Sequence, residues 1–136
     1  MAEFIFKQMI EQEGLSDEFE VDSAATDGVN EKFHLGMDHR AMQELRERDI
    51  PFHDRPSRQI RAEDYAHFDY ILVMDSQNLY SSSRIFGADE EHKIHRLLDF
   101  TDHPRDIKDP WYTGDFGECY WDLYDGCRAF LDYLEV

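Results

Sequence analysis

The stretch Phe68-Asp69-Tyr70-Ile71-Leu72-Val73-Met74-Asp75 contains five apolar residues in succession, from Tyr70 to Met74. A run of this length matches a β-strand, and the lack of polar alternation is typical of a parallel strand that is covered on both faces. Asp75 follows the run and is predicted to cap a helix that begins at Ser76. The stretch therefore predicts an α/β fold with a parallel sheet.

Segments on both sides of this run alternate between helical and strand-like patterns. Residues 18–24 alternate polar and apolar side chains, which predicts a short strand, and the apolar residues at 94–98 indicate another strand. Helical spacing of apolar residues predicts helices over residues 2–13, 38–48 and 116–134. We therefore expect an open parallel sheet flanked by helices on both faces.

The loops that leave the strands are the expected place for a functional site. In open parallel sheets, ligands bind beyond the carboxyl ends of the strands. The loops that follow Ser23, Met74 and Leu98 should therefore meet at one edge, and the Asp-, Asn- and Gly-rich residues 26–36 belong to the first of them. The third loop carries Asp109, so this carboxylate is expected at the predicted site.

The composition indicates one acidic globular domain, which we assign to residues 1–136. The 136-residue chain has 31 acidic and 14 basic residues and a net charge of −17. A charge of this sign repels nucleic acid and anionic membrane surfaces, so neither is expected as a partner. It also gives a well-solvated surface, as in a salt-adapted protein, and any phosphate site must rely on local hydrogen-bond donors.

The cysteines and histidines predict neither a disulfide nor a metal site. Cys119 and Cys127 lie two turns apart in a predicted helix, which is too far for a bridge. The histidines show no spacing typical of a metal site, and no cofactor is expected. Residues 1–7 lack the pattern of a secretory signal, and no apolar run is long enough to span a membrane. The expected location is the cytoplasm, with both thiols reduced.

The most specific motif is Asp109-Pro110-Trp111-Tyr112-Thr113-Gly114-Asp115-Phe116. It resembles the general-acid loop of the low-molecular-weight protein-tyrosine phosphatases. Further segments resemble the same family in the same order, and together they cover nearly the whole chain: 1–3, 21–26, 33–41, 58–60, 68–79 and 97–100. The resemblance implies the three-layer, Rossmann- or flavodoxin-like fold of that family. His39 departs from it where a Pro is usual, and Trp111 where a Tyr is more common.

The resemblance implies a phosphotyrosine phosphatase, a hydrolase that cleaves aryl phosphate monoesters through a cysteinyl-phosphate. Asp109 would protonate the departing phenolate and then activate the hydrolytic water. Trp111 and Tyr112 would form the apolar side of a slot for the phenyl ring, with Phe33 opposite. The alternatives are structural: Asp-Pro is a common turn opener, and the three aromatic residues could simply cover an edge of the core.

The nucleophile that this chemistry needs is missing from the sequence. The family carries it in a Cys-x5-Arg phosphate loop after the first strand, and no Cys-x5-Arg occurs in residues 1–136. Cys119 and Cys127 are predicted to be packing residues, because neither has the electropositive surroundings that stabilise a thiolate. We therefore expect a domain that is incomplete at its N-terminus, lacks the first strand and the phosphate loop, and is inactive alone.

Three interpretations of this absence stay open. The first is a phosphatase whose start was assigned at an internal Met-Ala-Glu, and the second is a genuine non-catalytic binding module of the same fold. A relationship to the arsenate reductases is the third. The missing strand would leave unpaired backbone groups on either side of a gap, so an oligomer or strand exchange through that gap is expected. The expected substrate is a phosphotyrosine protein or a small aryl phosphate.

Overall fold

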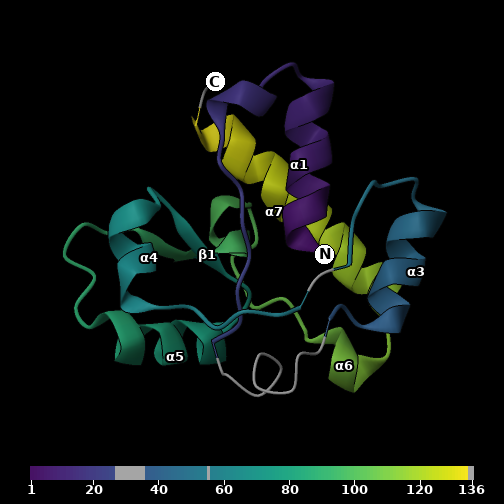
Figure 1. Ribbon diagram of the computed structural model, residues 1–136. Coiled ribbons are helices and arrows are strands. Elements are labelled where there is room, and N and C mark those ends of the chain that lie inside the picture. Colours follow the sequence, from purple (N-terminus) through teal and green to yellow (C-terminus); the bar gives the residue numbers. More distant parts are fainter. Residues whose placement is uncertain (27–35, 55, 135–136) are drawn as a thin grey trace.

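The computed structural model describes residues 1–26, 36–54 and 56–134, and its sheet forms at the predicted apolar run (Figure 1). Strand β1 (Ile71–Val73) pairs in parallel with β2 (Ile94–Arg96), with Ile71 opposite Ile94. Helix α4 (Ala62–His67) precedes β1 and α5 (Ser76–Phe86) follows it, and α5 contacts both strands. The parallel α/β arrangement predicted from the sequence is confirmed.

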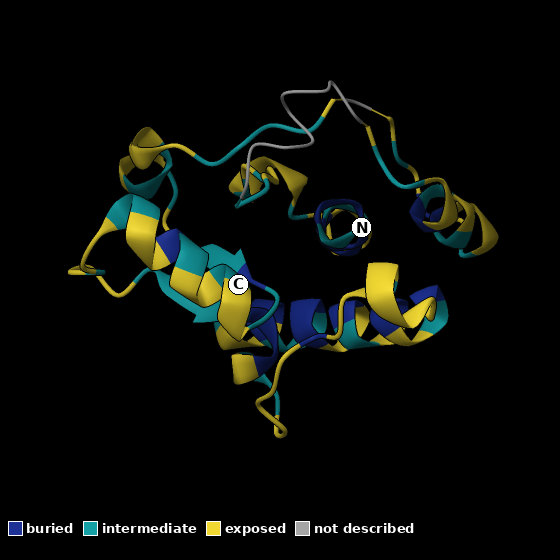
Figure 2. Ribbon diagram, turned by 90° about the horizontal axis from the view of Figure 1, so that it is seen from below, coloured by how far each residue is buried: buried dark blue, intermediate teal, exposed yellow. Residues whose placement is uncertain are grey.

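The larger part of the core lies between helices. Helix α1 (Ala2–Gln12) packs against the C-terminal helix α7 (Phe116–Leu134), and α7 also contacts α3 (His39–Glu47) and the 3-10 helix η2 (Leu97–Phe100). Buried positions concentrate where α1 and α7 face each other (Figure 2). Among the described residues, no helix is both long enough and apolar enough to cross a membrane.

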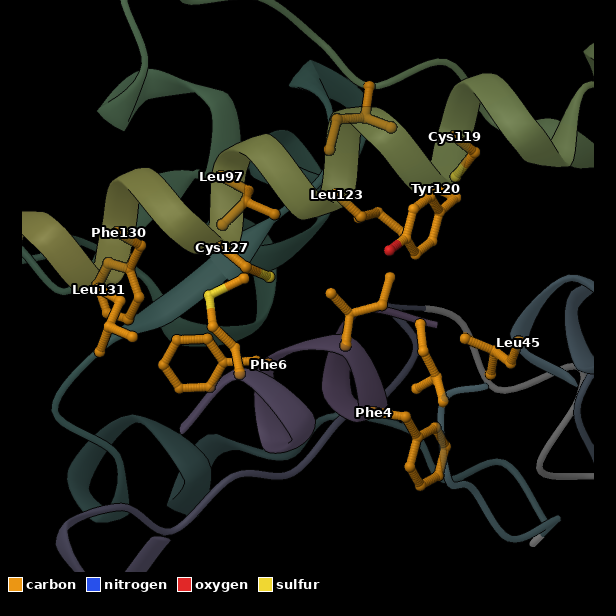
Figure 3. Packing of buried hydrophobic residues seen from close by; sticks show 14 of the residues in the cluster. Phe4, Phe6, Leu45, Leu97, Cys119, Tyr120, Leu123, Cys127, Phe130 and Leu131 are labelled. Carbon is orange, nitrogen blue, oxygen red and sulfur yellow. The ribbon is translucent and has the colours of Figure 1, made fainter. Parts of the chain in front are cut away.

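Helix α7 is the main contributor to this core. Its buried side chains recur at intervals of three and four residues, which places them on one face of the helix (Figure 3). They are Phe116, Cys119, Tyr120, Leu123, Cys127, Phe130 and Leu131. Gly126 lets η2 approach α7 closely, because a Cβ at this position would lie 2.5 Å from Leu97 Cγ. The helix predicted at residues 116–134 is confirmed at both ends.

Side-chain caps are present at the starts of two helices. Asp38 accepts a hydrogen bond from the backbone N–H of Arg40 at the start of α3, and Asp75 accepts one from Asn78 N–H at 2.7 Å. These bonds satisfy N–H groups that a helix leaves free in its first turn. The capping role predicted for Asp75 is therefore confirmed.

The strand predicted at residues 18–24 is not found in the structure. The 3-10 helix η1 (Ser16–Glu18) is followed by extended backbone that joins no named strand, and the pairing in this region is an isolated bridge between Ala25 and Gln59. Ala25 N–H donates to Arg58 O at 2.8 Å, and Ile60 N–H donates to Ala25 O at 2.9 Å. Alternation produces an extended backbone, but a strand also needs a neighbouring backbone to pair with.

The strand predicted at residues 94–98 is shorter than expected, because residues 97–100 form η2. The Asp99 carboxylate accepts a hydrogen bond from Arg96 N–H at 3.2 Å, and Arg96 Nη2 lies 2.8 Å from Asp99 Oδ1. Both bonds are donated by Arg96 and accepted by Asp99, and they start a helical turn that ends the strand at Arg96. The predicted loop at residues 26–36 lies almost entirely outside the described residues.

Candidate functional site

Asp109 lies at the start of a short exposed helix, α6 (Pro110–Thr113). Its Oδ1 accepts a hydrogen bond from the backbone N–H of Trp111 at 2.9 Å, and Pro110 occupies the first helical position, where no N–H is needed. Gly114 ends the helix with a φ of +73°, a conformation that favours glycine. The Asp109 carboxylate is thus held at an exposed helix start by its own backbone.

The loop that leads to Asp109 is fixed to the ends of both strands. Asp106 Oδ1 accepts hydrogen bonds from Ser76 N–H at 3.0 Å, from Ser76 Oγ at 2.9 Å and from Arg96 Nη1 at 3.0 Å. The Arg96 hydrogen bond lowers the pKa of Asp106. Ile107 is buried, and its N–H donates to Met74 O at 2.9 Å. The predicted meeting of the loops after Met74 and Leu98 is confirmed, whereas the loop after Ser23 lies mostly outside the described residues.

The other end of the site is held by Arg40 of α3. Its guanidinium carbon lies 5.4 Å from the centre of the Trp111 ring and 4.8 Å from that of Phe116. These distances are within the range of cation–π contacts. Trp111 is 65% exposed and Tyr112 is 84% exposed, so both rings are available to a ligand. The structure brings Asp109, Trp111 and Tyr112 together on α6, whereas Phe33 lies outside the described residues.

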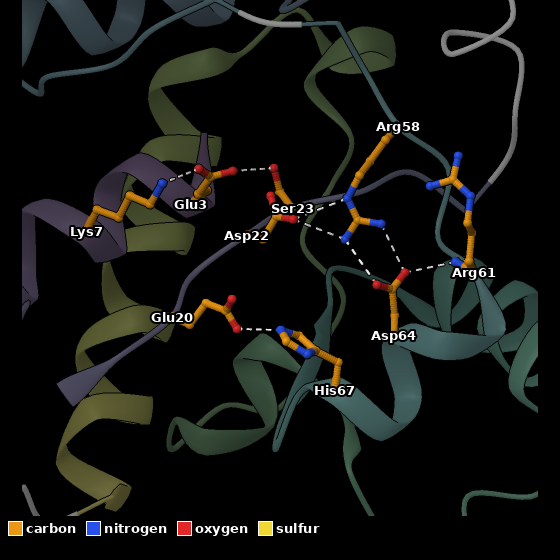
Figure 4. Close-up of polar contacts among 9 residues, drawn as sticks. All are labelled: Glu3, Lys7, Glu20, Asp22, Ser23, Arg58, Arg61, Asp64 and His67. Atoms are coloured by element: carbon orange, nitrogen blue, oxygen red, sulfur yellow. Dashed lines mark hydrogen bonds and ion pairs between the residues drawn. The ribbon is translucent and has the colours of Figure 1, made fainter. Parts of the chain in front are cut away.

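A buried carboxylate connects α1 to the extended segment that precedes residue 25 (Figure 4). Glu3 is only 4% exposed, and it accepts hydrogen bonds from Lys7 Nζ and from Ser23 Oγ, each at 2.6 Å. The sequence predicts an ordinary turn serine at position 23, and the structure instead joins it to this carboxylate. An acidic residue in the apolar first turn of α1 is the signal that could have indicated such a contact.

Side chains from the α4 region hold the same extended segment (Figure 4). Arg58 lies between two carboxylates, with Nη2 3.2 Å from Asp22 and Nη1 3.0 Å from Asp64. His67 Nε2 lies 2.6 Å from Glu20. Phe19 and Val21 of the same segment pack against the hydrophobic core, so both polar and apolar side chains position it, and no backbone ladder does so among the described residues.

The two cysteines are core residues, as predicted. Both are buried and free of disulfides. Burial raises the pKa of Cys119 to about 11, with further upward contributions from Asp122 and Asp109, and it raises the pKa of Cys127 to about 12. Both groups are neutral thiols at neutral pH and are weak nucleophiles. Within the described ranges, no group of three or more His, Cys, Asp or Glu side chains is arranged to hold a metal ion.

Comparisons with known proteins agree with one another. A family model described as "Low molecular weight phosphotyrosine protein phosphatase" matches residues 1–136. The low molecular weight protein-tyrosine-phosphatase YfkJ of Bacillus subtilis is 36% identical over 139 residues, covering 99% of this chain and 86% of that protein. The human low molecular weight phosphotyrosine protein phosphatase is 34% identical, covering 97% of this chain and 85% of that protein. The crystal structure of YfkJ superimposes with a TM-score of 0.88 at 34% identity, covering 98% of this chain and 84% of that one.

Proposed function

Because this chain belongs to the low molecular weight phosphotyrosine protein phosphatase family, we propose that its α6 region serves the hydrolysis of phosphotyrosine in proteins or of small aryl phosphates. The observation that carries this proposal is the exposed Asp109 carboxylate at the start of a helix whose next two side chains after Pro110 are exposed aromatic rings. An acid beside an aryl-binding surface is what the departure of a phenolate requires.

Asp109 would act twice in this reaction. When the bond between phosphorus and the aryl oxygen breaks, the protonated carboxyl donates its proton to that oxygen, so that a neutral phenol leaves. The resulting carboxylate then accepts a proton from the water that attacks phosphorus in the second step. Its exposure gives Asp109 access to water, and the Trp111 N–H bond to Oδ1 holds it in one orientation.

Trp111 and Tyr112 would bind the aryl ring of the substrate. Aromatic side chains gain from stacking as well as from the burial of their apolar area. We propose that the phenyl group lies against these two rings, with Phe33 on the opposite side of the slot. Substitution of either ring by Ala is then expected to raise KM for aryl phosphates more than it lowers kcat.

Residues 1–136 alone are proposed to turn over no aryl phosphate. The reaction needs a thiolate, whereas Cys119 and Cys127 are buried thiols with raised pKa values. The test is hydrolysis of p-nitrophenyl phosphate at pH 5–7 by these residues and by their Cys119→Ser and Cys127→Ser variants. Turnover that either substitution abolishes would refute the proposal.

Free thiols suit a reducing compartment, and we propose the cytoplasm.

The role of Asp109 can be tested in a hybrid that carries a first strand and a Cys-x5-Arg loop of the family type in front of residue 1. Asn at position 109 can still accept the Trp111 N–H bond but has no acidic proton to transfer, so Asp109→Asn preserves the cap and removes the acid. We expect kcat/KM for phenyl phosphate, which reports formation of the cysteinyl-phosphate and not its hydrolysis, to fall about 100-fold. The loss for p-nitrophenyl phosphate should be smaller, because its leaving group departs without protonation.

Asp102→Asn is the matched control for this experiment, since it removes one exposed carboxylate from the same loop region. It should leave both rates unchanged. Equal losses for the two substrates in Asp109→Asn would contradict a role as general acid. An inactive hybrid with native Asp109 would contradict the proposed function of the α6 region itself.

We also propose that the sheet pairs with a second copy of the chain. In the described residues the sheet has two strands, so β1 pairs with β2 along one edge and presents its other edge to no named strand. An unpaired edge has free N–H and C=O groups that can accept another strand. Light scattering over a range of concentrations should detect an oligomer. A monomer with a cooperative thermal transition would contradict this proposal.

A further inference from the structure

The Arg40 guanidinium is surrounded by three groups from two parts of the chain. Two are the rings of Trp111 and Phe116, which lie on either side of the α6–α7 junction. The third is the Asp38 carboxylate, which accepts hydrogen bonds from Arg40 Nε at 3.3 Å and from Nη2 at 3.2 Å. A planar guanidinium suits both kinds of neighbour, because it stacks on rings and pairs with a carboxylate through two N–H groups.

The two rings differ in how firmly they are held. Phe116 is buried at the start of α7, the longest helix of the core. Trp111 is mostly exposed and belongs to α6, a helix of four residues. So short a helix has little stability of its own, since helix formation has a costly first turn. Contacts to the rest of the protein must therefore decide how α6 lies.

From this arrangement we propose that Arg40 is a positioning residue that clamps Trp111 against the α3–α7 body and thereby sets the orientation of α6. The Trp111 N–H is also the donor to Asp109 Oδ1, so holding Trp111 holds the carboxylate that precedes it. The inference rests on the proposed function for its catalytic meaning, because the clamp would order the aryl-binding ring and the acid before a substrate arrives.

Asp38 contributes to the same clamp. Its Oδ1 caps α3 through the Arg40 N–H at 2.8 Å, while the same carboxylate pairs with the Arg40 side chain. Backbone and guanidinium are thus fixed by one group, which limits the directions in which the arginine can point. Ordering the guanidinium in advance reduces the entropy that Trp111 must overcome to stack on it.

The proposal can be tested without any enzymatic assay, because Trp111 is one of two tryptophans in the chain. In a Trp121→Phe background, Trp111 is the only tryptophan, and acrylamide quenching and nanosecond anisotropy report its exposure and motion. A cation–π contact at an exposed site shifts a local equilibrium by about two- to fivefold. Because Trp111 is already 65% exposed, we expect Arg40→Gln to raise the quenching constant by up to about 1.5-fold and to increase the fast component of the anisotropy decay.

Two further variants separate the clamp from a general effect of charge. Arg46→Gln removes the same charge from the same helix, but Arg46 lies over Phe52 and not over Trp111, so no change is expected. Arg40→Lys keeps the charge and loses the planar stacking, so it should restore part of the effect. An Arg40→Gln protein with a native circular dichroism spectrum and unchanged quenching would overturn the proposal.

Asp38→Asn serves as a second variant if Arg40→Gln fails to fold, since Asn is also a good helix cap. It weakens the hold on the guanidinium, and a smaller rise in Trp111 quenching is expected. No rise in this variant would also overturn the clamp. None of these readouts depends on phosphate hydrolysis, so a failed clamp and a failed phosphatase assignment give different results.

Discussion

Replacing Gly126 by Ala should destabilise the protein, although alanine is the better helix former. A Cβ at this position would lie 2.5 Å from Leu97 Cγ, 2.9 Å from Leu97 Cδ2 and 3.3 Å from Leu98 Cδ2. Leu97 is 2% exposed and Leu98 is 0% exposed, so neither side chain can move into solvent. Overpacking of this kind costs about 3 kcal/mol at the upper end of its usual range. The higher helix propensity of alanine stabilises the protein by about 1 kcal/mol. The free energy of unfolding should therefore fall by about 2 kcal/mol.

The assay is urea unfolding followed by circular dichroism, with the m-value checked for constancy. Gly117→Ala is the control on the same helix, because its Cβ would meet the nearest atoms at 3.6 and 3.8 Å, which are ordinary contacts. This variant should be as stable as the parent or more stable by up to about 1 kcal/mol. Combining Gly126→Ala with Leu97→Ala should cost less than the sum of the two single changes, since the clash is then absent. If Gly126→Ala is no less stable than the parent, the packing argument for η2 against α7 is wrong.

Three further predictions concern charge and burial. Arg58→Ala should lower the free energy of unfolding by about 1–2 kcal/mol, because Asp22 and Asp64 both lose a partner, and calorimetry against Arg46→Ala checks this. Burial raises the pKa of Cys127 from 9.0 to about 12, so its stabilising contribution is complete below pH 9 and is lost as pH rises toward 12. A Cys127→Ala protein should therefore lose less stability than the parent between pH 8 and 11, and parallel pH profiles would contradict this. With a net charge of −17, the thermal midpoint should rise as NaCl is raised from low ionic strength, and a flat or falling midpoint would exclude self-repulsion as a dominant cost.

Local signals in the sequence account for the elements that were predicted well. The apolar run that ends at Met74 and the helical spacing of residues 116–134 each identify one element by itself. The same is true of Asp75, whose capping bond spans only three residues. The strand prediction for residues 18–24 was wrong because a strand needs a neighbouring strand to pair with. The alternation of polar and apolar residues carries no information about which backbone lies beside them.

In the candidate site, too, residues with a local sequence signal could be predicted and residues that act through distant contacts could not. Asp109, Trp111 and Tyr112 could be found because they belong to one continuous motif on α6. Arg40 could not, because its contact with Trp111 joins segments that are far apart in the sequence, and a cation over a ring has no characteristic spacing along the chain.

The extended segment before residue 25 has a consequence for how the protein tolerates mutation. A backbone ladder is made by N–H and C=O groups that nearly every residue possesses, so most substitutions leave it intact. This segment instead depends on the chemical identity of its side chains: Glu20, Asp22 and Ser23 make polar contacts, and Phe19 and Val21 pack against the core. Individual side chains therefore fix the position of this segment. A single substitution of a polar residue by an apolar one can shift a stretch of chain that an ordinary strand would have kept in register.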